Sequence, residues 1–148
     1  MVARFFGTYE HTLDAKGRVI LPVRFRAAFD QGGYLTQNHD GCLALWTPEQ
    51  FERQMRDREE RESAGRPERN QARMWASTSH EVELDRQGRM PIPSRLREFA
   101  GLRENVLVTG IINRVELWDP TRWEEKVGPE EQRLADGLAD GLADGNEG

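Results

Sequence analysis

A segment of fourteen residues occurs twice in the chain, and this repetition constrains the fold more than any other feature. The first copy covers residues 13–26 and the second covers residues 84–97, seventy-one positions later. Seven of the fourteen positions are identical, and they are Leu, Asp, Gly, Arg, Pro, Arg and Arg. The 148-residue chain therefore contains one small module twice. Modules of this size bury little apolar surface alone, so we expect them to share a core within one chain or to complete it between chains.

Each module follows the same predicted order of elements: strand, turn, return strand, short helix, strand pair and helix. In the first module, residues 5–13 and 18–21 are the predicted strands around the turn. Pro22 suits the first position of the short helix. Residues 34–37 and 42–46 form the second strand pair, around an Asp-Gly hairpin signal. The second module repeats this plan, so the sequence predicts a mainly β protein with short helices, in the α+β class.

The modules occupy two predicted domains, residues 8–55 and 79–122. Residues 56–78 between them are nearly all charged or polar, and a glycine and a proline interrupt the segment. We predict two connecting helices around a bend. Residues 128–148 form an acidic tail with three consecutive copies of Leu-Ala-Asp-Gly, and each glycine costs a helix about 1 kcal/mol. We expect disorder there, while a rival interpretation makes the leucines a weak partner-binding stripe.

The net charge of −5 is distributed unevenly along the chain. Residues 129–148 hold six acids and one base, so the remainder of the chain is neutral. Residues 1–30 hold five bases and three acids. Because local charge decides where a polyanion binds, the acidic total does not exclude nucleic-acid binding.

The sequence offers no residues for an enzyme, a metal site or a cofactor. The three histidines, His11, His39 and His80, have no metal-ligand spacing with one another or with Cys42, and no nucleotide-binding glycine loop occurs. The single cysteine excludes an intramolecular disulfide and indicates a reducing cytosol. No apolar run approaches the roughly 18 residues of a membrane span, and the first residues lack a secretory signal.

The repeated turn has the pattern Asp-x-x-Gly-Arg, and its aspartate and glycine have a structural explanation. An aspartate side chain accepts hydrogen bonds from nearby backbone N–H groups, and glycine takes a positive φ without steric cost. The predicted structural residues are Asp14, Gly17, Asp85 and Gly88. Two explanations remain open for Arg18 and Arg89: they pair with the aspartates to lock the turn, or they bind phosphates and guanine edges.

The first copy is the better surface for a polyanion. It has Lys16 where the second copy has the neutral Gln87, and no acid occurs in residues 15–29. The second copy adds Arg86 but has three glutamates nearby. A two-stranded ribbon can enter a major groove, as a helix can. The predicted DNA-binding residues are Lys16, Arg18, Arg24 and Arg26, with Arg4, Arg89 and Arg95 as secondary candidates.

Several short motifs carry a resemblance to a known family. They are Phe6-Gly7, Leu13-Asp14-x-Lys16-Gly17-Arg18, Pro22-x-Arg24-x-Arg26, Asp85-x-x-Gly88-Arg89 and Glu116-Leu117-Trp118. Over about residues 4–127 the chain resembles the MraZ family of bacterial transcriptional regulators, which are built from two SpoVT-AbrB domains. The resemblance implies a swapped-hairpin barrel, in which the two modules of one chain interleave their strands as a pseudo-dimeric unit.

The resemblance also implies a function. It implies ring-shaped homo-oligomers in the cytoplasm, associated with the nucleoid, and binding to repeated double-stranded DNA boxes upstream of the division and cell-wall gene cluster. In the family, the basic residues of the repeated turn face DNA, which carries over to Lys16, Arg18, Arg24 and Arg26. Our hypothesis is a sequence-specific repressor of its own gene cluster. The alternative is a protein-interaction or antitoxin-like module without specific DNA binding.

Overall fold

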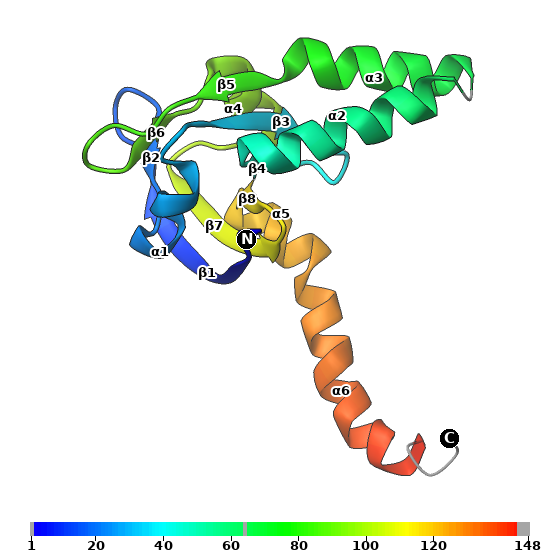
Figure 1. The fold of residues 1–148 in the computed structure, drawn as a ribbon. Coiled ribbons are helices and arrows are strands. Elements are labelled where there is room, and N and C mark those ends of the chain that lie inside the picture. The colour runs from blue at the N-terminus through cyan, green and yellow to red at the C-terminus, as the bar shows by residue number, and fades with distance from the viewer. Residues whose placement is uncertain (1, 64, 145–148) are drawn as a thin grey trace.

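The computed structural model describes residues 2–63 and 65–144 (Figure 1). The first module contains β1 (Phe5–Thr12), β2 (Arg18–Ile20), α1 (Val23–Arg26), η1 (Ala27–Phe29), β3 (Gly33–Gln37), β4 (Leu43–Trp46) and α2 (Pro48–Glu62). Helix α3 (Arg66–Thr78) leads to the second module. That module contains β5 (His80–Val82), β6 (Arg89–Pro91), α4 (Ser94–Ala100), β7 (Asn105–Ile112), β8 (Val115–Trp118), α5 (Pro120–Lys126) and α6 (Gly128–Asp144). The predicted α+β class is confirmed.

The two modules interleave their strands. The larger sheet has six strands in the order β1-β7-β8-β4-β3-β5. When the equivalent strands of the two modules are exchanged (β1 with β5, β3 with β7, β4 with β8), the same order is obtained, read from the other edge of the sheet. Strand β1 pairs antiparallel with β7 of the other module, from Phe5 opposite Ile112 to Thr12 opposite Asn105. Strand β5 pairs with β3, and β2 pairs with β6 in a separate two-stranded sheet. The chain is thus a pseudo-symmetric unit in which neither module completes its sheet alone.

Two details of the expected fold need correction. The strands on either side of each repeated turn do not pair with each other, so the turns are not hairpins within a module. The strands of the described residues also form an open sheet and a two-stranded sheet rather than a closed barrel. Strands β2 and β6 contain three residues each and are followed within two residues by Pro22 and Pro93. Because proline lacks the N–H that a ladder needs, these prolines limit the length of the two short strands.

Both modules contribute to one hydrophobic core. Phe5 of β1 stacks on Phe29 with ring centroids 5.5 Å apart, and its ring meets Phe25 edge-on at 5.4 Å. Val19 and Met90, which face each other across β2 and β6, are completely buried. Burying a side chain of this kind stabilises the fold by about 1.5–3 kcal/mol. The expectation of a shared core is therefore met within a single chain.

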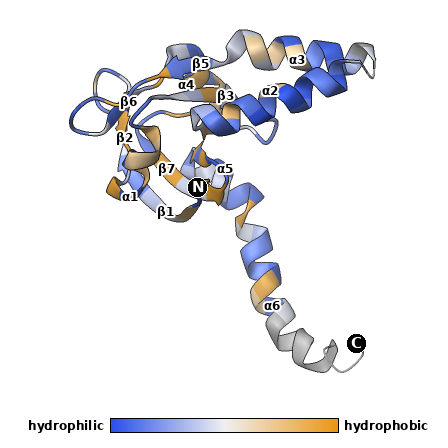
Figure 2. Ribbon diagram, viewed as in Figure 1, coloured by the Kyte–Doolittle hydropathy of each residue, from blue (hydrophilic) through white to orange (hydrophobic). Residues whose placement is uncertain are grey.

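The charged connecting segment forms the antiparallel pair α2 and α3, which meet at a bend around Gly65. Figure 2 shows α2 as almost entirely hydrophilic, so the helix depends on contacts at its first turns. The Thr47 hydroxyl accepts the backbone N–H of Gln50 at 3.2 Å and caps the helix. Phe51 of α2 stacks on Trp75 of α3 at 5.0 Å and on Tyr34 of β3 at 4.0 Å, so these aromatic contacts join the two helices to each other and to the sheet.

In the C-terminal segment, for which the sequence predicted disorder, Gly128–Asp144 form helix α6, which extends away from the sheets (Figure 1). Leucine and alanine have high helix propensity and offset the glycines, and Glu130 and Glu131 in the first turn favour the helix dipole. Residues 145–148 of the expected disordered segment lie outside the described residues. Among the helices of the described residues, none is long and apolar enough to cross a membrane.

Candidate nucleic-acid interface

The two copies of the repeated turn lie side by side at one end of the molecule (Figure 1). We call residues 13–18 loop one and residues 84–89 loop two, and together they are the paired loops. The pairing of β2 with β6 brings them together. Two reciprocal hydrogen bonds extend that pairing: the Leu21 N–H donates to the Gly88 carbonyl at 2.9 Å, and the Ile92 N–H donates to the Gly17 carbonyl at 3.0 Å. A ligand surface that contacts one loop therefore contacts both.

Asp14 organises loop one. One carboxylate oxygen, Oδ1, accepts the backbone N–H groups of Lys16 and Arg18, both at 2.9 Å. The other oxygen, Oδ2, accepts from Nε of Arg18 at 2.7 Å. The hydrogen bond from the Arg18 N–H is the largest cause that lowers the pKa of Asp14 below its ordinary value, and the Arg18 side chain lowers it further. Gly17 closes the turn with φ at 74°.

Loop two has the same internal geometry. Oδ1 of Asp85 accepts the N–H groups of Gln87 and Arg89, both at 2.9 Å, and Oδ2 accepts from Nε of Arg89 at 2.7 Å. Nη1 of Arg18 lies 3.9 Å from Oδ2 of Asp85, so an ion pair also links the two loops. The first of the two explanations left open for Arg18 and Arg89 is seen in the structure: both arginines pair with the aspartates of their turns, and both are half-buried. Binding of phosphates or guanine edges by these arginines stays a prediction.

Each loop is supported by an arginine from the other module. The Arg26 side chain packs against Gly88 in loop two, and its Nε donates to the Leu21 carbonyl at 2.9 Å. The Arg97 side chain packs against Gly17 in loop one, where a Cβ on the glycine would lie 2.7 Å from Cζ of the arginine. Glycine is thus required at both positions for its positive φ and for this close approach. Arg26, a predicted DNA contact, is half-buried beneath loop two.

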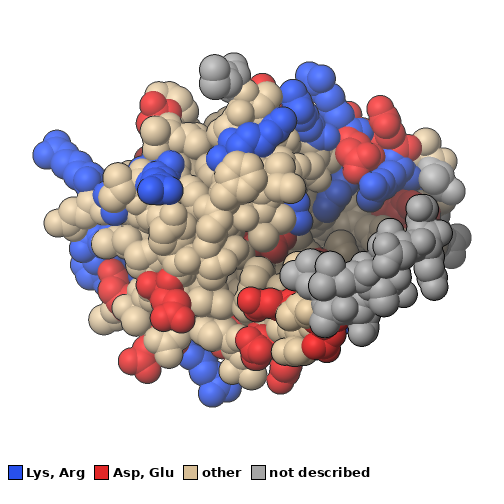
Figure 3. All heavy atoms as spheres, turned by 90° about the horizontal axis from the view of Figure 1, so that it is seen from below, with Lys and Arg blue, Asp and Glu red and all other residues tan. Residues whose placement is uncertain are grey.

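The exposed cations at this end come from the loop tips and from two short helices. Lys16 and Arg86 are exposed at the tips of loops one and two. Helix α1, which carries the exposed Arg24, lies against loop two through Arg26, and helix α4 with the exposed Arg95 lies against loop one through Arg97. Figure 3 shows Lys and Arg side chains projecting at the left edge of the molecule, the end that carries the paired loops in Figure 1.

Two residues differ from the site expected from the sequence. Arg4 precedes β1, and the eight residues of that strand separate it from loop one by about 25 Å at the usual rise per residue. The structure therefore does not bring Arg4 to the paired loops. Arg86 is at the tip of loop two but was not among the predicted site residues, because acidic residues occur near it in the sequence. Its position in the repeated turn was the signal that could have identified it.

Acidic residues also lie beside the paired loops. A cleft of about 600 Å³ next to loop one is lined by Lys16 and Arg97, and also by Glu81 and Glu83. Both glutamates are exposed. The positive surface is therefore narrow and centred on the loop tips and the two flanking helices.

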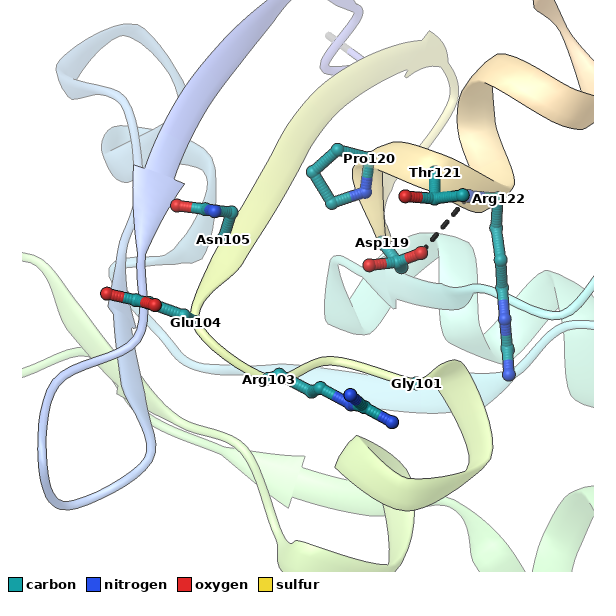
Figure 4. Close-up of a pocket in the computed structure, with 8 residues that line it drawn as sticks. All are labelled: Gly101, Arg103, Glu104, Asn105, Asp119, Pro120, Thr121 and Arg122. Atoms are coloured by element: carbon teal, nitrogen blue, oxygen red, sulfur yellow. Dashed lines mark hydrogen bonds between the residues drawn. The ribbon is translucent and has the colours of Figure 1, made fainter.

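A second cleft, of about 570 Å³, lies between α5 and the segment that joins α4 to β7 (Figure 4). Its lining contains Arg122, whose backbone N–H donates to Oδ2 of Asp119 at 3.1 Å. Nη1 of the same arginine donates to the carbonyls of Gly41 and Phe99, at 3.0 and 2.9 Å. Arg122 thus joins α5 to two other segments of the fold, and its guanidinium is committed to backbone carbonyls.

The described residues contain no group of three or more His, Cys, Asp or Glu side chains that could hold a metal ion. Cys42 is completely buried, and burial raises the pKa of its thiol far above the ordinary value. A buried neutral thiol is a poor nucleophile.

Comparisons with known proteins identify relatives over most of the chain. A family model described as "MraZ protein, putative antitoxin-like" matches residues 4–74 and 76–137. A protein of Nocardioides sp. named "Transcriptional regulator MraZ" is 40% identical over 121 residues, which cover 82% of this chain and 84% of the relative. Proteins of the same name from Cutibacterium acnes and Acetivibrio thermocellus are both 38% identical, over 89% and 85% of this chain and 93% and 88% of their own lengths.

Proposed function

The chain belongs to the MraZ family, and from that premise we propose that it is a transcriptional regulator that binds double-stranded DNA through the paired loops. One observation carries the proposal: two rigid loops project side by side, and each presents an exposed cation at its tip. Rigid loops lose little conformational entropy on binding. The name shared by the relatives supports the role in transcription.

In this proposal the basic residues have two different roles. Lys16 and Arg86 at the loop tips contact DNA directly, and Arg24 and Arg95 contact the flanking phosphates. Contacts to phosphates fix the position and orientation of a protein on the duplex. The half-buried arginines, Arg18, Arg89, Arg26 and Arg97, hold the loops in place. Arg18→Ala would therefore disturb the loop as well as any DNA contact, so substitutions at the tips test the interface more cleanly.

We further propose that several copies of the chain act together on repeated DNA boxes upstream of the chain's own gene, and that they repress the division and cell-wall gene cluster from the nucleoid. One chain presents two small loops, which supply few contacts. An oligomer that presents several pairs of loops to regularly spaced boxes gains affinity through effective concentration, provided that the spacing of the boxes fits. This arrangement would allow weak individual contacts to give a stable complex.

A gel-shift titration with the DNA upstream of the chain's own gene tests the proposal. We expect discrete shifted bands that an unrelated duplex does not compete away. If Lys16, Arg86, Arg24 and Arg95 each neutralise one phosphate, the affinity of one chain should fall roughly 100-fold between 50 and 200 mM salt. Nuclease footprinting on the same fragment should show protected boxes at regular intervals.

Two results would contradict the proposal. Affinity that is constant across this salt range would exclude a contact dominated by phosphates. The absence of any shift with the upstream DNA, together with a stable complex with another protein of the same cell, would support the alternative of a protein-interaction or antitoxin-like module.

A further inference from the structure

The paired loops have the same backbone but different side chains at their tips. Lys16 in loop one and Gln87 in loop two occupy equivalent positions, since the backbone N–H of each is bound at 2.9 Å by the aspartate two residues earlier. Both side chains are exposed. The backbone fixes where these side chains begin, and the side chains remain available to a ligand. If the paired loops meet DNA together, Gln87 faces the duplex in the same way as Lys16.

The chemistry of the two side chains suits different parts of DNA. The ammonium group of lysine is a compact charge that favours phosphate, and its contacts displace counterions. The carboxamide of glutamine is neutral and gains nothing from counterion release. It has one acceptor and two donors in one plane, which match the N6 donor and the N7 acceptor of adenine in the major groove. Phosphate offers acceptors only, so it can bind the N–H donors of the carboxamide but leaves the carbonyl acceptor unused.

We propose that Gln87 determines sequence specificity by hydrogen-bonding the major-groove edge of one adenine in the DNA site. This inference rests on the proposed function of the paired loops. The neighbouring Arg86 supplies the charge that holds loop two against the duplex, so Gln87 can recognise a base without carrying the affinity. The two loops share their backbone hydrogen bonds but differ in the side chains at their tips, so in this proposal they recognise different features of one DNA site.

The rigid base of loop two makes this contact specific. Asp85 binds the N–H groups on both sides of Gly88, and the Arg26 side chain packs against that glycine. A side chain that begins from a fixed backbone needs to order only its own rotamers on binding. The backbone bond from Gln87 to Asp85 does not involve its carboxamide, so substitution of the side chain leaves the loop intact.

The experiment begins with selection of preferred duplexes from a random pool by the full-length chain, followed by affinity measurements on each single base-pair variant. Gln87→Ala should lose its preference at one A·T pair, by about 5- to 150-fold in discrimination. Its salt dependence should stay as in the unchanged chain. The matched control is Lys16→Ala at the equivalent position, which should weaken all duplexes alike and reduce the salt slope by about 1.

A base analogue provides a second measurement that does not depend on the variant's stability. Replacing the adenine with 7-deazaadenine removes the N7 acceptor, so it should weaken binding to the unchanged chain but leave Gln87→Ala unaffected. If Gln87→Ala keeps the preferences of the unchanged chain at every position, the role of Gln87 is wrong while the proposed function stands. If the unchanged chain selects no duplex at all, the proposed function fails and the inference fails with it.

Discussion

Asp14 and Asp85 determine the shape of the paired loops at the level of single residues. Each carboxylate binds two backbone N–H groups and one guanidinium, and no other side chain of its loop makes as many contacts. The hydrogen bond from the backbone of Arg18 is the first cause that lowers the pKa of Asp14, and the bond from Arg89 does the same for Asp85. The loops should therefore respond to acid.

The pH range of that response follows from the direction of the shifts. A carboxyl whose pKa is lower in the folded state stabilises the fold when ionised, so its contribution is complete above the ordinary value of 3.8 and is lost as pH falls through the folded-state pKa. We expect the loops to be unchanged between about pH 5 and pH 8 and to loosen below about pH 4. Hydrogen exchange at the amides of Lys16 and Arg18 measures this. Protection that persists at pH 2 would contradict the role of the aspartates.

The glycines of the loops provide a second test at this scale. Gly88→Ala places a Cβ against the Arg26 side chain at φ 81°, so we expect the free energy of unfolding to fall by about 1–3 kcal/mol. Gly137→Ala is the matched control, because nothing lies within 4 Å of its Cβ position in α6, and it should stabilise the helix by about 1 kcal/mol. Urea denaturation compares the two. Equal effects from both substitutions would contradict both the positive φ of Gly88 and the packing of Arg26 against it.

The sequence predicted the roles of Asp14 and Gly17 correctly, because turn chemistry depends on neighbouring residues only. It could not predict that Arg26 would be half-buried, since the glycine that Arg26 contacts lies sixty-two residues away in the other module. The sequence did not identify the exposed tip residue Arg86 for a related reason. Glutamates lie near Arg86 in the sequence, while contact with a ligand depends on position in the folded loop.

At the scale of elements, each short helix supports the loop of the other module. Arg26 and Arg24 are on the same helix, α1, but only Arg26 reaches loop two. Arg26→Ala removes its hydrogen bond to the Leu21 carbonyl and its packing on Gly88, and should lower the free energy of unfolding by about 1–3 kcal/mol. Arg24→Ala should change it by less than about 0.5 kcal/mol. Thermal and urea unfolding of both variants check this, and a stability loss from Arg24→Ala as large as that from Arg26→Ala would refute the assignment.

The strand pairing shows what a repeated sequence leaves undetermined. The existence and the order of the strands were predicted well, since alternation and turn signals are local. This local pattern did not determine the partners of the strands, and only the family resemblance implied that the two modules interleave. Both modules carry the same pattern, so the pairing of β1 with β2 and the pairing of β1 with β7 are equally compatible with it. The short strands and the prolines after them decide in favour of the exchange between modules, because β2 has too few residues to pair along the eight residues of β1.

For the whole molecule, charge is divided between a basic end and an acidic tail. Residues 129–148 hold six acids and one base. Helix α6, which contains residues 129–144 of this segment, extends away from the sheets (Figure 1). Removal of this segment makes the net charge of the chain zero. We expect the shortened chain to bind DNA roughly two- to tenfold more tightly at about 50 mM salt, and the difference to vanish near 0.5 M, where charges beyond a few ångströms are screened.

Fluorescence anisotropy with a labelled duplex measures this effect, and thermal unfolding provides the control. Among the described residues, the main hydrophobic core contains none from α6, so the shortened chain should unfold at nearly the same temperature. A difference in affinity that persists at high salt would mean that the tail acts through a specific contact instead of through its charge.

The most direct test of DNA binding by the paired loops is to compare substitutions at both tips with one elsewhere. Lys16→Ala and Arg86→Ala remove one exposed cation from each loop, and Arg53→Ala removes an exposed cation from α2. Salt titrations of anisotropy, with DNA from upstream of the chain's own gene, give the affinity and the salt slope for each. We expect each tip substitution to weaken binding by about tenfold and to reduce the slope by about 1, while Arg53→Ala changes neither. Tight, salt-sensitive binding by the double variant Lys16→Ala/Arg86→Ala, equal to that of the unchanged chain, would place the DNA elsewhere on the molecule.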